Sequence, residues 1–138
     1  MLQSIERQIY TNIEHIIVDD GSTDNSHSLL NEYWGRGNSY TKIILNQENY
    51  GCVAKLRNQA VRVSSGKYIL NIDSDDILYS DAISTLVEEA ENDHLDLTYG
   101  SMIYIDQYGS PHKPSQLAGS KYKFGYLIKN VYPFPTNV

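Results

Sequence analysis

Two short apolar runs in this chain end abruptly in clusters of acidic residues. The first run covers residues 15–18 and is followed by Asp19-Asp20-Gly21, and the other covers residues 67–72 and is followed by Asp73-Ser74-Asp75-Asp76. A continuous apolar run such as residues 15–18 is typical of a buried parallel strand, and residues 67–72 are a further candidate strand. Segments of helical periodicity separate the runs. We therefore predict an α/β fold, with a mostly parallel sheet flanked by helices.

The other predicted elements follow from local signals. Residues 42–45 and 96–105 are two more candidate strands, and residues 108–111 form a turn. We predict helices at the start of the chain, after the capping residues 24–26, after Gly51 and after Ser80. Gly66 stands where a helix C-cap glycine belongs.

The acidic clusters predict a ligand site. In an open α/β sheet, ligands bind beyond the carboxyl ends of the strands, so both clusters should meet at one edge. Five carboxylates at one edge repel each other unless a cation neutralises them, and hard oxygen ligands suit Mg²⁺ or Mn²⁺. The alternative is that these residues are ordinary turn and cap residues, which Asp, Gly and Ser often are after a strand.

Three ordered segments resemble family 2 glycosyltransferases. Residues 17–24, Ile-Val-Asp-Asp-Gly-Ser-Thr-Asp, resemble the nucleotide-binding signature of the family, and residues 68–76 resemble its metal-binding strand end. Asn46-x-x-Asn49-x-Gly51, followed by Leu56-Arg57-Asn58, is similar to the segment between them. The likeness runs from about residue 1 to residue 106 and more faintly to residue 138. It implies one partial domain over residues 1–138, the Rossmann-like nucleotide-binding half of a GT-A fold without its usual first strand.

The resemblance also implies roles for the nucleotide-binding residues. Asp20, beside Asp19, is expected to accept a hydrogen bond from the base, usually uracil. Arg57, and with weaker support Lys55, is expected to approach the diphosphate, because a cation compensates its charge. An ordinary surface ion pair is the alternative for Arg57.

The metal roles fall on the second acidic cluster. The resemblance implies that Asp75 is a metal ligand, with Asp73 and Asp76 directed toward the ribose, the donor sugar or the metal. A bound Mn²⁺ or Mg²⁺ stabilises the leaving nucleoside diphosphate in such enzymes.

The expected function is metal-dependent, inverting transfer of a sugar from a nucleoside diphosphate sugar, by resemblance a UDP-sugar, to an acceptor hydroxyl. The acceptor is a sugar or a lipid-linked molecule, and bacterial polysaccharide assembly is the setting that the resemblance suggests. The family places its catalytic base, a carboxylate, far downstream, but no acid follows Asp106. We therefore expect the base outside this chain. Since general base catalysis typically contributes ~10²–10⁴-fold, we expect the chain to bind a nucleotide sugar weakly and to transfer it poorly.

Two alternatives remain open from the sequence, and a third match is accidental. The chain could be a non-catalytic fragment that keeps only nucleotide binding or an assembly role. A haloacid-dehalogenase-type phosphotransferase also has Asp-x-Asp at a strand end, but it requires Thr or Val where this chain has Ile77. A metal-dependent adhesion module matches Asp24-x-Ser26-x-Ser28, although those residues fall inside a predicted helix.

Charge and hydropathy limit the partners. The net charge is −6, and all 17 acidic residues lie within residues 1–106, whereas residues 107–138 carry four lysines and no acid. An acidic body argues against nucleic acid as a partner. The sequence has no apolar stretch of the ~20 residues that span a bilayer. We expect a cytoplasmic protein, and we leave open peripheral attachment at the inner membrane face and assembly into a homo-oligomer.

Overall fold

The computed structural model describes residues 1–35 and 40–111. Within these residues the chain forms two compact units. Unit 1 contains residues 1–3 and 10–77, and unit 2 contains residues 4–9 and 78–111. Helix α1 (Leu2–Glu6) confirms the helix predicted at the start of the chain. None of the helices in the described ranges is long and apolar enough to cross a membrane.

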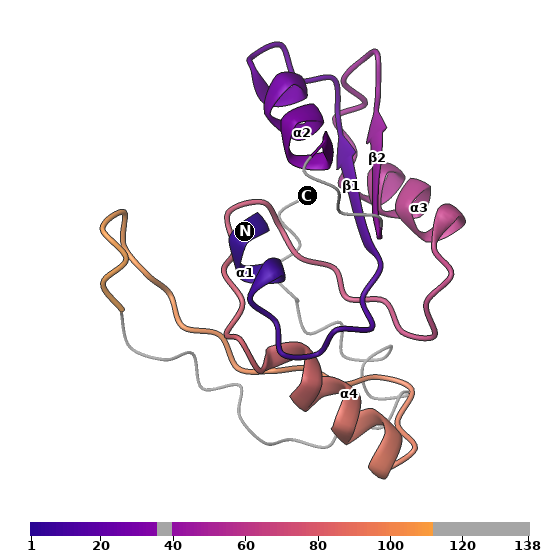
Figure 1. Cartoon of the computed structure of the whole chain (residues 1–138), viewed down its shortest axis with the longest axis vertical. Helices are drawn as coiled ribbons and strands as arrows, with labels where there is room; N and C mark the ends of the chain where they lie inside the picture. The colour runs from indigo at the N-terminus through magenta and orange to yellow at the C-terminus, as the bar shows by residue number, and fades with distance from the viewer. Residues whose placement is uncertain (36–39, 112–138) are drawn as a thin grey trace. The chain divides into compact units, whose positions relative to one another are not determined.

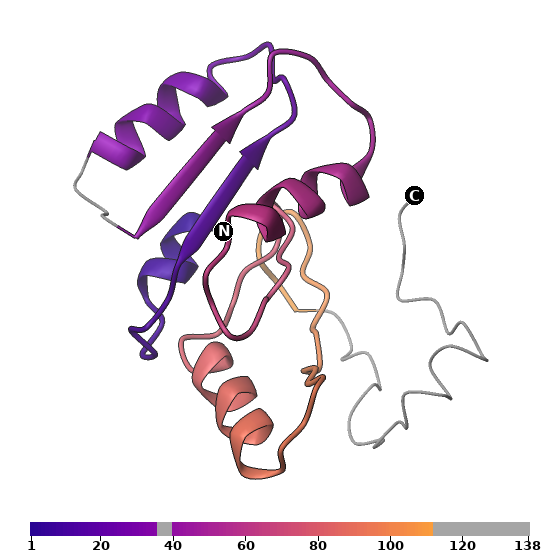
Figure 2. The same cartoon turned by 90° about the vertical axis from the view of Figure 1, so that its right-hand side faces the viewer.

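Unit 1 is built on a parallel pair of strands, β1 (His15–Asp19) and β2 (Thr41–Leu45). Their register runs from His15 opposite Thr41 to Asp19 opposite Leu45. Helix α2 (Ser26–Gly35) connects the strands and packs on β2, and helix α3 (Val53–Val63) follows β2 and packs on β1. The two helices lie on opposite sides of the strand pair (Figures 1 and 2). This arrangement confirms the predicted α/β class with a parallel sheet flanked by helices.

Hydrogen bonds between neighbouring residues stabilise the start of α2 and the end of α3 in unit 1. Asp24 Oδ1 accepts the N–H of Ser26 at 2.9 Å, which confirms the predicted capping segment before α2. The prediction for Gly66 was wrong, because α3 ends earlier, with Ser64 as its C-cap residue. The N–H and the hydroxyl of Ser64 both donate to the carbonyl oxygen of Val61, at 3.2 and 2.8 Å. A left-handed glycine is therefore not needed to terminate this helix.

The predictions of strands at residues 67–72 and 96–105 were wrong. Among the described residues, β1 and β2 are the strands, and the second segment contributes only a bridge between Ile105 and Pro111. An apolar run becomes a strand only where a neighbouring strand accepts and donates its backbone hydrogen bonds. No described strand pairs with residues 67–72, and Ile69 and Leu70 remain 52% and 45% exposed.

Unit 2 centres on helix α4 (Ala82–Asn92), whose Ala90 is buried. The helix was predicted, but its N-cap residue is Asp81 rather than Ser80. The side chain of Gln8 holds the start of this helix: its Nε2 donates to the carbonyl oxygen of Tyr79 at 2.7 Å, and its Oε1 accepts the N–H of Ile83 at 3.1 Å.

The turn predicted at residues 108–111 forms as part of a tight loop. Asp106 Oδ1 accepts the N–H groups of Tyr108 and Ser110, at 2.8 and 2.9 Å. Gly109 has a φ of 81°, which favours glycine at this point of the loop. The lysine-bearing residues 112–138 lie outside the described residues.

Candidate functional site

The carboxyl ends of β1 and β2 bury polar residues. Asp19 ends β1, Asn46 directly follows β2, and each is 8% exposed. The N–H of Asn46 donates to the carbonyl oxygen of Asp19 at 3.1 Å, which continues the strand pairing by one more hydrogen bond. Because buried polar groups need partners, these strand ends hold a network of polar contacts rather than an apolar core.

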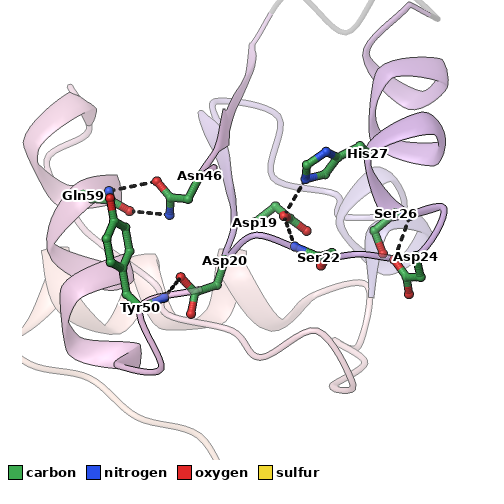
Figure 3. Close-up of polar contacts among 9 residues, drawn as sticks. All are labelled: Asp19, Asp20, Ser22, Asp24, Ser26, His27, Asn46, Tyr50 and Gln59. Carbon is green, nitrogen blue, oxygen red and sulfur yellow. Dashed lines mark hydrogen bonds and ion pairs between the residues drawn. The ribbon is translucent and has the colours of Figure 1, made fainter. Parts of the chain in front are cut away.

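Asp19 turns toward helix α2. Its Oδ1 accepts the N–H of Ser22 at 2.9 Å and lies 2.8 Å from Nε2 of His27 (Figure 3). Burial raises the pKa of Asp19, but the hydrogen bonds from Ser22 and His27 outweigh burial and hold this pKa below its ordinary value. The carboxylate is thus stabilised in its charged form within the protein. Sequence reasoning missed His27, because no spacing signal links it to Asp19.

Asp20 turns the other way, toward the loop before α3. Its two carboxylate oxygens accept the N–H groups of Tyr50 and Gly51, at 2.9 and 3.1 Å. Figure 3 shows Asp19 and Asp20 directed to opposite sides of the chain. The two adjacent acids therefore have separate surroundings, and Asp20 is the one beside the start of α3. A carboxylate oxygen accepts more than one hydrogen bond, so Asp20 keeps capacity for a ligand.

Gly21 allows the loops after β1 and β2 to touch. Its φ is 72°, and a Cβ at this position would lie 2.7 Å from the carbonyl carbon of Glu48 and 2.8 Å from the backbone nitrogen of Asn49. Both features exclude a side chain. Glycine here brings the loop of residues 48–51 close enough for its amides to reach Asp20.

Arg57 and Asp73 meet in unit 1. The Nη2 of Arg57 donates to Oδ1 of Asp73 at 3.0 Å, and the side chains are 47% and 63% exposed. Asp73 opens a turn in which its carbonyl oxygen accepts the N–H of Asp76 at 3.1 Å. Asp75 and Asp76 are exposed on that turn. The structure therefore joins the second acidic cluster to α3 through an ion pair, although no strand leads into the cluster.

A metal ion has no complete cage of protein ligands in the described ranges. No group of three or more His, Cys, Asp or Glu side chains is arranged there to hold one.

Lys55, the other predicted diphosphate contact, places its Nζ 3.1 Å from the ring centroid of Tyr50, in a cation–π contact. Asp20, Lys55 and Arg57 thus all lie on or against the first half of α3 and the loop before it.

The chain is similar to known glycosyltransferases. A family model described as "Glycosyl transferase family 2" matches residues 1–137. The chain is 37% identical over 106 residues to the glycosyltransferase GlyG of Streptococcus pneumoniae, which covers 77% of this chain and 35% of that protein. It is 37% identical over 130 residues to an uncharacterized glycosyltransferase of Haemophilus influenzae, covering 94% of this chain and 38% of that protein.

A relative with a more specific name is the poly(ribitol-phosphate) beta-glucosyltransferase of Bacillus spizizenii. The chain is 30% identical to it over 144 aligned positions, which cover 91% of this chain and 22% of that protein. The chain therefore spans well under half the length of the curated relatives it matches here.

Proposed function

Because the chain belongs to glycosyl transferase family 2, we propose that it forms the nucleotide-sugar-binding part of a metal-dependent, inverting enzyme. The donor is a UDP-sugar and the acceptor is a hydroxyl group of a sugar or a lipid-linked molecule. The observation that carries this proposal is that α3 and the loop before it contact both acidic clusters. Asp20 accepts the N–H of Gly51 in the loop before α3, and Asp73 pairs with Arg57 on the helix.

The nucleotide occupies the side of Asp20 that faces α3. Asp20 accepts a hydrogen bond from the base, while the amides of Tyr50 and Gly51 hold its carboxylate in place. This assignment leaves Asp19 to support the loop, since its carboxylate faces Ser22 and His27. Its contribution to nucleotide binding is therefore indirect.

Arg57 binds the diphosphate. Its guanidinium has five N–H donors, the ion pair with Asp73 engages Nη2, and the side chain is half-exposed. Arginine forms strong, charge-assisted hydrogen bonds with phosphate oxygens. The ion pair with Asp73 keeps the guanidinium beside the acidic turn, where the diphosphate would meet both the cation and the metal.

The exposed acidic turn suits a divalent ion shared with the substrate. Mg²⁺ is usually held by one or two carboxylates together with phosphate oxygens and water, rather than by a cage of protein side chains. Asp75 is the proposed ligand, with Asp73 and Asp76 as the neighbours that bind the metal, the ribose or the donor sugar. Mn²⁺ or Mg²⁺ at this place supplies a Lewis acid that stabilises the leaving diphosphate.

Catalysis needs a base that this chain does not offer after Asp106. We place the base outside the chain, together with the acceptor site, so the chain binds the donor but transfers its sugar poorly. A non-catalytic binding or assembly role shares this site and differs only in turnover. An assay of sugar release and transfer separates the two roles for any longer form of the protein.

Calorimetry of UDP with the purified chain tests the proposal. We expect binding in the presence of Mn²⁺ and its loss with excess chelator, because a bound divalent ion would neutralise the charge of the diphosphate beside the acidic turn. Asp75→Ala should abolish the metal-dependent part, whereas the matched control Asp96→Ala, also at an exposed aspartate, should bind as wild type does. Equal binding by the two variants, or binding indifferent to Mn²⁺, would remove the metal site from the proposal.

A further inference from the structure

Two side-chain amides join the end of β2 to the middle of α3. Asn46 Nδ2 donates to Gln59 Oε1 at 3.0 Å, and Gln59 Nε2 donates back to Asn46 Oδ1 at 3.1 Å. Figure 3 shows the two amides facing each other. Asn46 is 8% exposed, and its N–H also bonds to the carbonyl oxygen of Asp19. Gln59 is thereby tied to the sheet through a residue that is itself fixed in the backbone ladder.

Apolar packing holds α3 only loosely. No residue of this helix is buried, and Val53, Val61 and Val63 are 48%, 42% and 41% exposed. Hydrophobic contact is non-directional, so shallow packing of this kind leaves the rotation of a helix about its axis weakly determined. A reciprocal amide pair has two directional bonds, so it restricts this rotation more narrowly than apolar contact does.

The rotation of α3 decides where Arg57 points. Successive residues of an α-helix are turned by about 100°, so positions 57 and 59 face nearly opposite directions. With Gln59 directed at Asn46 and the sheet, Arg57 is directed away from it and reaches Asp73 at 3.0 Å. A turn of the helix by one position would carry the guanidinium away from the acidic turn.

We propose that Gln59 is a positioning residue that, through Asn46, holds α3 in the rotation at which Arg57 meets Asp73 and the diphosphate. This inference rests on the proposed function for the diphosphate and on the observed contacts for the rest. Gln59 itself does not touch the nucleotide. Its effect on binding therefore passes entirely through Arg57.

A swap of the two amides tests the proposal. Gln59→Asn shortens one arm and Asn46→Gln lengthens the other, so each single variant breaks the match, whereas the double variant keeps the combined length. Neither change alters the charge. We expect each single variant to lose about fivefold in affinity for UDP with Mn²⁺, the equivalent of one net hydrogen bond, and the double variant to recover most of it. The full chain is used throughout, at a temperature where each variant is folded by circular dichroism.

A second cycle separates positioning from mere stability. In an Arg57→Ala background, Gln59→Asn should lower the melting temperature as before but cause no further loss of affinity. The proposal is overturned if Gln59→Asn loses as much affinity for UDP in the Arg57→Ala background as it does in wild type. It is also overturned if the folded single variants bind UDP with unchanged affinity.

The test also has a readout that needs no nucleotide. The stability coupling between Arg57 and Asp73, measured by a double-mutant cycle, should disappear in Gln59→Asn and return in the swapped double variant. A coupling that persists in Gln59→Asn contradicts the positioning role, even if the single variants prove too unstable for calorimetry. If wild type fails to bind UDP at all, the proposed function fails, while this cycle still decides whether Gln59 positions Arg57.

Discussion

Replacement of Gly21 by alanine is the sharpest test of how the loops after β1 and β2 are held together. A non-glycine residue in the left-handed region costs about 1–2 kcal/mol. The new Cβ would also lie 2.7 Å from the carbonyl carbon of Glu48, a backbone atom that moves only with its loop. Overpacking of this kind typically adds about 1–3 kcal/mol. We therefore expect Gly21→Ala to lower the free energy of unfolding by about 2–5 kcal/mol.

Gly51→Ala is the matched control in the same unit. Gly51 has a φ of 58°, but a Cβ added there would have as its nearest neighbour the flexible Oδ1 of Asn49 at 3.7 Å, an ordinary contact. This variant should show the conformational cost alone, about 1–2 kcal/mol. Urea denaturation followed by far-UV circular dichroism measures both variants.

The difference between the two variants isolates the contact between the loops. If Gly21→Ala destabilises the chain no more than Gly51→Ala does, the close approach of residues 21 and 48 is not a feature of the folded protein. Displacement of the 48–51 loop should also weaken the amide contacts of Asp20. We therefore expect Gly21→Ala to bind UDP more weakly than Gly51→Ala does.

Three further outcomes are expected. The pKa of Asp19 is held below its ordinary value, so the Asp19 carboxylate stabilises the fold above the unfolded pKa of about 3.9, and this stabilisation is lost as the pH falls through the lower folded pKa. Wild type should therefore lose more stability in acid than Asp19→Asn does. Parallel losses of stability in acid titrations of the two proteins would contradict this. Arg57→Ala should lower the free energy of unfolding by under about 1 kcal/mol in urea denaturation, because its ion pair with Asp73 is exposed. The same variant should bind UDP clearly more weakly. A variant that binds UDP as wild type does would make Arg57 an ordinary surface residue. In thermal melts, Mn²⁺ with UDP should raise the melting temperature and excess chelator should reverse the rise, since a ligand that binds only the folded state stabilises it. An unchanged melting temperature at saturating UDP with Mn²⁺ would contradict metal-assisted binding.

Local signals in the sequence were sufficient for most elements of unit 1. The apolar runs at β1 and β2 and the helical stripe of α3 each determine an element from neighbouring residues alone. The segment 67–72 has the same local signal, but whether it forms a strand depends on a partner that local pattern does not reveal. β1 and β2 are each other's partners, whereas residues 67–72 have no partner among the described strands.

The roles of the candidate site residues stay predictions, and the structure adds the contacts that some of them make. Arg57 and Asp73 come into contact as members of one candidate site, which their spacing of sixteen positions did not require. Asp19 and Asp20 were grouped as nucleotide-binding residues because they are adjacent, but Asp19 contacts His27 of α2, whereas Asp20 contacts the loop before α3. The role of Gln59 could not be predicted, because an amide on a helix becomes informative only when its partner across the fold is known.

The central claim is that Asp20 and Asp75 serve one ligand, and a crystal structure of the chain with UDP and Mn²⁺ tests it most directly. We predict the base within hydrogen-bonding distance of the Asp20 carboxylate and the metal bound between Asp75 and the diphosphate. A nucleotide that contacts only one of these two residues, or a metal bound elsewhere, would contradict it.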